Sequence, residues 1–354
     1  MKRMFYIIAF TRAGIALGKS IQQKKSEIDG LNDLLFGWYK YVEEDAIPFD
    51  HTKRLLEKIW KQAENILFIG AAGIAVRSIA PFLTDKVSDP AILVMDEKGK
   101  FVIPILSGHL GGANAYCERL AREIGAIPVI TTATDCNQCF AVDLFAKKNK
   151  LWIVDWHRIK EISSRILDKE PIGWISEYNI AGTLPSELIQ IEKKEGVQSS
   201  KIEAGVVIAS KISPPYFQWE CRLLPKNLVL GIGCKRGKPL EEIELFLEQE
   251  LKQHGFQKQQ VNKIVSIDRK QQEKGLIELS GKWKIPFLTY SSEQLNAVEG
   301  AFSESDFVKQ TVGTSNVCER AAYLGSGCGK KRIGKTVKDG MTMAVYEEAI
   351  RISF

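Results

Sequence analysis

The chain has 354 residues, of which 45% are hydrophobic and 26% are charged, and its formal net charge is +6 at pH 7. This length exceeds what one compact core usually supports, so two or three domains are expected. The mild positive charge suits an anionic small molecule, and Lys and Arg are not interleaved with aromatic residues as on a nucleic-acid-binding surface. No apolar run is long enough to span a bilayer. The sequence therefore predicts a globular protein with neither nucleic-acid nor membrane partners.

The seven cysteines are an odd number, which argues against a disulfide framework and favours a reducing, cytoplasmic location. The apolar segment 4–10 is short and is interrupted by Thr11 and Arg12, so a first strand is expected there rather than a signal peptide. The pair Cys136 and Cys139 lacks further ligands at the spacing of a zinc site and lacks a thioredoxin-like context. We expect no metal site.

Strand and helix signals alternate through the first 135 residues. Apolar, β-branched runs predict strands, and segments with helical spacing separate most of them. The predicted strands cover 5–10, 35–41, 66–70, 91–95, 101–105 and 127–131, and the predicted helices cover 51–63, 73–82 and 113–124. This alternation predicts βαβ units in a largely parallel sheet. Only five residues, 96–100, separate two of the strands, which predicts a hairpin at that point.

The pattern weakens after Asp135 and becomes regular again near Asn227. In between, strands are expected at 151–156 and 205–210, and the stretch 177–201 is polar and irregular. The last part predicts strands at 227–233, 285–290 and 341–347 and helices at 240–253, 274–283 and 315–324. The predicted fold class is α/β, with largely parallel sheets and flanking helices. An N-terminal domain (1–135) and a C-terminal domain (227–354) are joined by a smaller middle domain (136–226).

The motif LSGHLGGAN, residues 106–114, lies between a predicted strand and a predicted helix. Its glycines allow a ligand to approach the backbone, and the helix N-terminus suits an anion or a developing oxyanion. His109 can exchange a proton near neutral pH. A tight turn with an exposed histidine is the alternative. Because ligand crevices form at the carboxyl ends of parallel strands, we favour a site. Its candidate residues are Ser107, Gly108, His109, Gly111, Gly112 and Asn114.

Three further junctions carry candidate residues. FIGAAGIAVR (68–77) has the spacing G-x-x-G instead of the dinucleotide fingerprint, so no nicotinamide cofactor is expected, and Arg77 is either a carboxylate ligand or a surface residue. VLGIGCKRGKP (229–239) predicts an anion clamp made by Gly233, Lys235 and Arg236. The turn 311–316 offers Thr314 and Ser315, although Ser315 is alternatively only a helix N-cap. GCGKKRIGK (327–335) lacks the residues of a phosphate loop.

Together these motifs resemble the cobalt-precorrin-5A hydrolase (CbiG) family of anaerobic cobalamin biosynthesis. The resemblance covers essentially the whole chain and is most specific where SGHLGGAN is followed by VITTATD (129–135). It rests on DKVSDPAILVMDEKGKFVIPILSGHLGGAN (85–114), VITTATD, LVLGIGCKRG (228–237), IDRKQQEKGLIELS (267–280), TSNVCERAA (314–322) and TMAVYE (342–347).

The resemblance implies a hydrolase that acts on a cobalt corrinoid bearing a ring-A lactone and many carboxylate arms. Water opens the lactone, the two-carbon unit at C20 leaves as acetaldehyde, and a carbon–carbon bond is broken. Cobalt enters inside the substrate, so no separate cofactor is expected. In this chemistry His109 is the candidate general base, and the N–H groups of Gly111 and Gly112 are candidate oxyanion donors. Asp135 orients His109 or protonates the leaving fragment. Carboxylate arms are assigned to Arg77, Lys98, Lys235 and Arg236.

The alternative function is a non-catalytic corrinoid carrier of the same pathway, because the last domain resembles a unit that occurs alone in the aerobic pathway. A carrier needs the anion clamps but does not need His109. A homodimer and transient contacts with other enzymes of the pathway are both compatible with the sequence.

Overall fold

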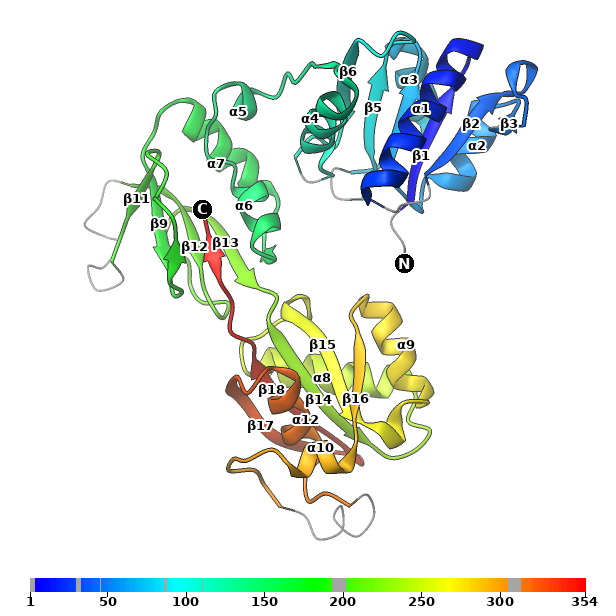
Figure 1. Cartoon of the computed structure of the whole chain (residues 1–354). Helices are drawn as coiled ribbons and strands as arrows, with labels where there is room; N and C mark the ends of the chain where they lie inside the picture. Colours follow the sequence, from blue (N-terminus) through cyan, green and yellow to red (C-terminus); the bar gives the residue numbers. More distant parts are fainter. Residues whose placement is uncertain are drawn as a thin grey trace. The chain divides into compact units, whose positions relative to one another are not determined.

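The computed structural model describes residues 4–29, 33–44, 46–85, 88–109, 111–192, 202–304 and 313–354. The chain divides into two compact units, Met1–Leu144 and Phe145–Phe354. Figure 1 labels their helices and strands. In the described residues no helix is both long and apolar enough to cross a membrane.

The first unit is built on a seven-stranded sheet with the order β3-β2-β1-β4-β5-β6-β7. Its strands are β1 (Met4–Ala9), β2 (Leu34–Trp38), β3 (Ile47–Phe49), β4 (Ala63–Ile69), β5 (Ala91–Met95), β6 (Phe101–Leu106) and β7 (Ile127–Pro128). Its helical segments are α1 (Arg12–Asp29), η1 (Tyr39–Tyr41), α2 (Thr52–Ile59), α3 (Ala72–Ile79), η2 (Ala80–Phe82), α4 (Ala113–Ile124), α5 (Ala133–Cys136) and the start of α6 (Val142–Lys148).

Helices cover both faces of this sheet. One core cluster joins the sheet to α1 and α4 through residues such as Ile21 and Leu120. A second cluster joins the opposite face to α2 and α3 through residues such as Leu56 and Ile79. The alternating apolar pattern of the sequence is thus the pattern of a sheet that is buried on both sides.

The predicted hairpin at residues 96–100 is confirmed. It determines at which edge of the sheet each candidate motif lies. Strands β1 to β5 are all parallel, but β6 pairs with β5 in the antiparallel sense and β7 then follows β6 in parallel. Leu106, at the end of β6, stands opposite Ile92, at the beginning of β5. The segment after β6 therefore lies at the edge where β5 begins, whereas the segments after β4 and β5 lie at the other edge.

The second unit contains two five-stranded sheets. The first has the order β11-β9-β12-β13-β8, in which all pairs are parallel except β13 with β8. Its elements are β8 (Leu151–Ile153), α7 (His157–Leu167), β9 (Ile172–Ser176), β11 (Leu188–Gln190), β12 (Ala204–Ile208) and β13 (Trp219–Pro225). A separate parallel pair joins β10 (Ile180–Ala181) to β19 (Ile352–Ser353).

The other sheet of this unit has the order β16-β15-β14-β18-β17. Its strands are β14 (Leu228–Cys234), β15 (Val261–Ile267), β16 (Phe287–Tyr290), β17 (Lys330–Lys338) and β18 (Met341–Glu347). Helices α8 (Leu240–Gln253) and α9 (Lys274–Trp283) pack on one face, and α10 (Ser292–Asn296) and α12 (Cys318–Gly325) pack on the other. Short 3-10 turns η4 (Lys258–Gln260) and η5 (Asp268–Lys270) flank β15.

The predicted fold class is confirmed, with differences in individual elements. The strand predicted at 35–41 ends at Trp38, and the strand predicted at 127–131 pairs over only two residues. The middle region is more regular than its sequence indicates. The sequence pattern is weak there because the strands of its sheet are only three to seven residues long and leave little periodicity to detect. The rejected phosphate loop runs into the edge strand β17, which supports its rejection.

Candidate active site

The loop between β6 and α4 is a tight structure that uses its glycines for internal packing. A Cβ atom at Gly111 would lie 2.4 Å from the Cβ of Ser107, and one at Gly108 would lie 2.7 Å from Oδ1 of Asn114. Gly112 has a φ of 86°, in the left-handed region that glycine adopts without strain. Each glycine therefore has a local structural reason, and the approach of a ligand to this backbone stays a prediction.

Backbone N–H groups at the start of α4 donate hydrogen bonds to carbonyl groups within the same loop. The N–H of Gly112 donates to the carbonyl of His109 at 3.1 Å, and the N–H of Ala113 donates to Ser107 at 3.2 Å. Asn114 N–H donates to the carbonyl of Gly108 at 3.0 Å. The predicted use of Gly112 as an oxyanion donor is therefore corrected, because its N–H group is already bonded within the loop. Ser107 is likewise engaged, since its hydroxyl donates to the carbonyl of Asp89 at 3.1 Å.

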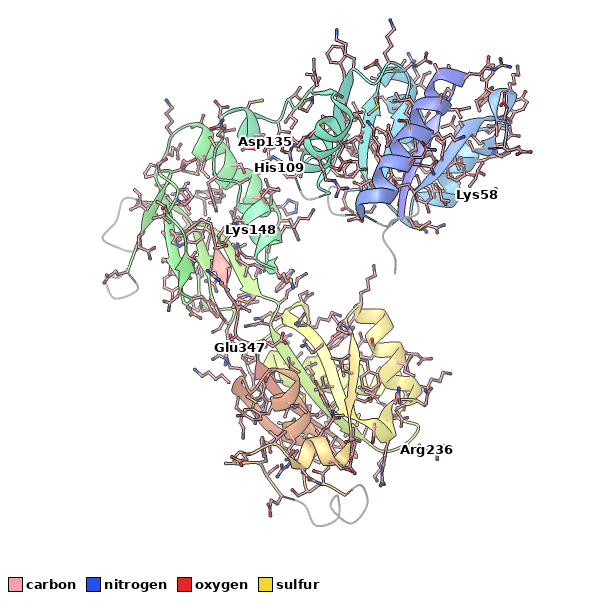
Figure 2. All side chains as sticks on the ribbon, viewed as in Figure 1. Lys58, His109, Asp135, Lys148, Arg236 and Glu347 are labelled. Atoms are coloured by element: carbon pink, nitrogen blue, oxygen red, sulfur yellow. The ribbon has the colours of Figure 1, made fainter. Side chains whose placement is uncertain are left out.

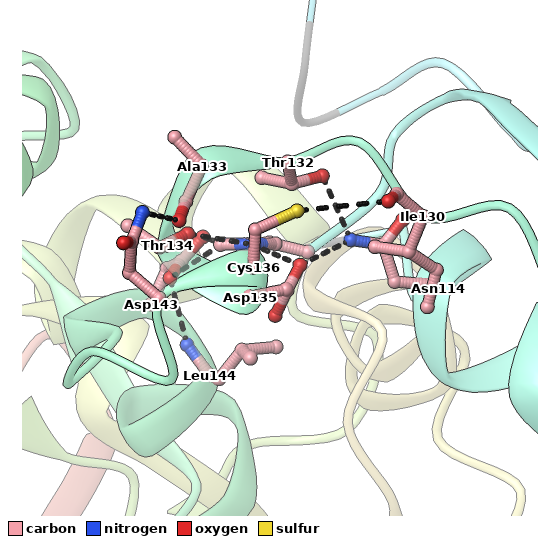
Figure 3. Close-up of polar contacts among 11 residues, drawn as sticks. Asn114, Ile130, Thr132, Ala133, Thr134, Asp135, Cys136, Asp143 and Leu144 are labelled. Carbon is pink, nitrogen blue, oxygen red and sulfur yellow. Dashed lines mark hydrogen bonds and ion pairs between the residues drawn. The ribbon is translucent and has the colours of Figure 1, made fainter.

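This arrangement presents the His109 side chain, which is labelled in Figure 2, to a cluster of polar groups, of which Thr134, Asp135 and Asp143 are labelled in Figure 3. Nε2 of His109 lies 2.9 Å from a carboxylate oxygen of Asp135, and Nδ1 lies 3.3 Å from a carboxylate oxygen of Asp143. The Thr134 hydroxyl lies 3.1 Å from Nε2. Asp135 and Thr134 come from the short helix α5, and Asp143 comes from the first turn of α6. The imidazole ring is thus held between two carboxylates, one at each nitrogen.

Asn114 fixes the outer carboxylate of this cluster. Its side-chain amide donates to Asp135 at 2.5 Å and to the Thr132 hydroxyl at 3.0 Å (Figure 3). Asn114 is buried. The prediction that Asn114 contacts substrate directly is therefore replaced by a supporting role, in which it orients Asp135.

The two carboxylates change the protonation of His109. The hydrogen bond to Asp143 raises the pKa of His109, burial lowers it, and the negative charges of Asp143 and Asp135 raise it further, so that the pKa lies above its ordinary value. An imidazolium has a proton on each nitrogen and can donate to both carboxylates at once. The predicted role of general base needs a nitrogen without a proton, and the raised pKa moves the loss of that proton to higher pH.

Arg77 and Lys98 lie at the other edge of the same sheet. Arg77 is on α3, which begins after the carboxyl end of β4, and its guanidinium reaches back to within 3.5 Å of the position of a Cβ at Gly73. Lys98 is in the hairpin turn that leaves the carboxyl end of β5. Five strand residues at about 3.3 Å each separate the two edges by about 16 Å. The structure therefore does not bring these two cations to His109.

The candidate residues around β14 form a separate group in the second unit. Lys235 and Arg236 are exposed in the loop that follows β14. A Cβ atom at Gly233 would lie 2.6 Å from Oγ1 of Thr342, so this glycine is explained by packing between β14 and β18. The buried carboxylate of Glu273 accepts hydrogen bonds from the N–H of Gly237 at 2.7 Å and from Lys270 at 2.6 Å, and it thereby holds the loop in place.

The turn before α12 is only partly available to a ligand. Thr314 is fully buried, which corrects the prediction that it contacts substrate, whereas Ser315 is half-buried. The N-cap alternative for Ser315 is also wrong, because α12 begins at Cys318 and the Asn316 side chain accepts the N–H of Glu319 at 2.9 Å. Residues 311 and 312 of the predicted turn lie outside the described residues.

The cysteines at 136 and 139 are free thiols, as are the other five. Cys136 lies at the end of α5 and is exposed. Within the described residues, no group of three or more His, Cys, Asp or Glu side chains has an arrangement that could hold a metal ion.

Sequence reasoning missed Asp143 and Thr134. Thr134 is adjacent to Asp135 and could have been found by reading ATD as one unit. Asp143 lies in AVDLF, 34 residues after His109, where no motif marks it.

Comparison with known proteins defines the class of the chain. Three family models match consecutive parts of it: Cobalamin synthesis G N-terminal at residues 54–135, Cobalamin biosynthesis central region at 140–225, and Cobalamin synthesis G C-terminus at 228–346. The two motifs that build the His109 cluster, SGHLGGAN and TTATD, fall inside the first match.

Two relatives that match nearly the full length of the chain have the same name. A cobalt-precorrin-5A hydrolase from Salmonella typhimurium is 33% identical over 96% of both chains, and one from Priestia megaterium is 28% identical over 96% of this chain and 94% of its own. A solved cobalamin biosynthesis protein G homolog from Sulfolobus solfataricus is 20% identical, covers 98% of both chains and has a TM-score of 0.42. The chain belongs to the CbiG family, which includes the cobalt-precorrin-5A hydrolases.

Proposed function

We propose that this chain is a cobalt-precorrin-5A hydrolase that opens the ring-A lactone of its corrinoid with water and releases the C20 two-carbon unit as acetaldehyde. The observation that carries the proposal is the His109 cluster, an imidazole held between a buried and a partly exposed carboxylate. The similarity of the chain to two proteins named cobalt-precorrin-5A hydrolase, over 96% of its length, supports the same function. The seven free thiols support a reducing, cytoplasmic location.

The overall reaction consumes one water. The hydroxyl of water adds to the lactone carbonyl, the ester C–O bond breaks, and the other proton of water is taken up by a base. The alkoxide oxygen that leaves is attached to C20, which belongs to the two-carbon unit. When the bond between C20 and the macrocycle breaks, C20 and this oxygen become the carbonyl group of acetaldehyde, and the ring carbon that C20 leaves takes a proton. This places the reaction among hydrolyses of carbon–carbon bonds.

The protonation of the cluster assigns a role to each group. The His109 imidazolium donates its Nε2 proton to the departing alkoxide oxygen, and the resulting neutral imidazole removes the same proton when the carbon–carbon bond breaks. Asp135, with 28% of its side chain exposed, takes the proton of the attacking water and later gives it to the ring carbon that C20 leaves. The protons balance without another donor.

Binding of the corrinoid is assigned to cations that face solvent. Lys235 and Arg236 are exposed and suit the carboxylate arms of the substrate. Arg77 and Lys98 form a second pair of exposed or half-buried cations in the first unit. Cobalt arrives as part of the substrate, so the proposal includes no resident cofactor.

The test is acetaldehyde release from the lactone-bearing cobalt corrinoid, measured with a coupled alcohol dehydrogenase assay. Release with multiple turnovers per protein chain supports the hydrolase. Stoichiometric corrinoid binding without acetaldehyde would refute it and would leave the non-catalytic carrier, for which the His109 cluster has no use.

A further inference from the structure

We infer that Asp143 is the positioning residue that fixes His109, so that the imidazole exchanges protons through Nε2 only. The inference rests on the proposed function for its catalytic consequence, but the positioning itself is a property of the folded chain. Asp143 belongs to no sequence motif described above, and the sequence predicts no role for it.

The first observation is the unequal exposure of the three side chains. Asp143 is 8% exposed, His109 is 16% exposed and Asp135 is 28% exposed. The three groups thus form a line from the interior toward the surface. We therefore assign substrate access to the Asp135 side of the ring, at Nε2, because Asp135 is the most exposed of the three side chains and Asp143 is the most covered.

The second observation is that Asp143 is itself held in place. It lies in the first turn of α6, and one of its carboxylate oxygens accepts the N–H of Leu144 at 3.0 Å. A buried carboxylate is costly unless its oxygens accept hydrogen bonds, and this one has a backbone donor and an imidazole donor. The carboxylate is therefore fixed in position.

The consequence concerns the tautomer of His109. After the imidazolium has given its Nε2 proton to the substrate, the remaining proton must stay on Nδ1 so that Nε2 can act as the base. A carboxylate that accepts from Nδ1 enforces this tautomer. The distance from Nδ1 to Asp143 is 3.3 Å, and the distance from Nε2 to Asp135 is 2.9 Å.

Among the described residues, the charged groups that contact the ring are Asp143 from α6 and Asp135 from α5, and the uncharged Thr134 hydroxyl also contacts Nε2. Both carboxylates raise the pKa of His109, and the hydrogen bond from Asp143 is the largest contribution. Removing the charge of Asp143 is therefore expected to lower this pKa more than removing that of Asp135.

The experiment compares the full chain with Asp143→Asn and uses two readouts. NMR titration of the histidine C–H signals, with His109 assigned by its loss in His109→Gln, is expected to show a lower pKa for His109 in Asp143→Asn. The rate of acetaldehyde release is expected to fall by about 10²–10⁴-fold with KM nearly unchanged, because Asp143 does not touch the substrate. The alkaline limb of the pH–rate profile should move to lower pH.

The matched control is Asp89→Asn, which removes a carboxylate of similar burial that accepts from Thr84 instead. It should leave the His109 pKa unchanged. Asp143→Glu, which keeps the charge, should retain the raised pKa and recover part of the rate, and it provides the test if Asp143→Asn does not fold.

A His109 pKa that is equal in wild type and Asp143→Asn, or a rate that falls only through KM, would overturn the positioning role. A lowered pKa in a protein whose wild type releases no acetaldehyde would instead refute the proposed function and leave the positioning role intact.

Discussion

Replacement of Gly111 by alanine tests whether the loop that carries His109 depends on close packing. The new Cβ would lie 2.4 Å from the Cβ of Ser107 and 2.7 Å from its carbonyl oxygen. Carbon atoms in contact are normally about 3.5–4.0 Å apart, so the two segments must separate by roughly 1 Å or more. Ser107 cannot yield freely, because its hydroxyl donates to Asp89 and its carbonyl accepts the N–H of Ala113.

Two effects are expected from this separation. Overpacking of this kind costs about 1–3 kcal/mol of unfolding free energy. A displacement of about 1 Å at a catalytic group costs on the order of 10²-fold in rate. We therefore expect Gly111→Ala to release acetaldehyde about 10²-fold more slowly, with stability reduced in urea unfolding. The sequence alone predicts that the glycines let a ligand approach the backbone, and the structure adds contact inside the loop as a second reason for glycine at position 111.

The control is Gly125→Ala at the C-terminal end of the same helix. Gly125 has a φ of 77°, and nothing lies within 4 Å of the position of its Cβ. Alanine there costs about 1–2 kcal/mol through backbone strain but should leave the rate of turnover unchanged. If Gly111→Ala kept the wild-type kcat, or if Gly125→Ala lost as much activity, the link between loop packing and catalysis would be refuted.

Three further predictions follow from the site. His109→Ala should bind the corrinoid normally but release acetaldehyde about 10²–10⁴-fold more slowly, and an undiminished single-turnover rate would remove His109 from catalysis. Arg236→Ala should weaken corrinoid binding more than it lowers kcat. Because Arg236 is exposed, we expect a loss of about 1 kcal/mol of binding free energy, or about fivefold in affinity. An unchanged affinity in a titration would exclude Arg236 from the binding site. Because the pKa of His109 is raised in the folded chain, chiefly by the hydrogen bond to Asp143, its stabilising contribution is fully present below about pH 6.5 and is lost as pH rises through the folded value. The difference in unfolding free energy between wild type and His109→Gln should therefore shrink from pH 6 to pH 9, and a constant difference would contradict the raised pKa.

Much of the fold could be predicted from the sequence because it is encoded locally. The strands around Ile7, Leu67 and Leu93 are apolar runs, and each is buried in the sheet. The five-residue connection at 96–100 is too short for a crossover helix, so only a hairpin was possible. The middle region could not be predicted as well, because strands as short as β8 and β11 leave no periodic signal.

The sequence by itself determined that this chain has α/β units, a hairpin before SGHLGGAN, and a histidine and an aspartate in two motifs 26 residues apart. Only the tertiary structure decided which candidates share a site. The antiparallel turn into β6 reverses the chain and moves His109 to the edge of the sheet away from Arg77 and Lys98. Packing buries Thr314 and closes the glycine loop on itself, and α6 brings Asp143 to a ring 34 residues away. Direction of a strand and contact between distant segments depend on the whole fold, so no local pattern of residues specifies them.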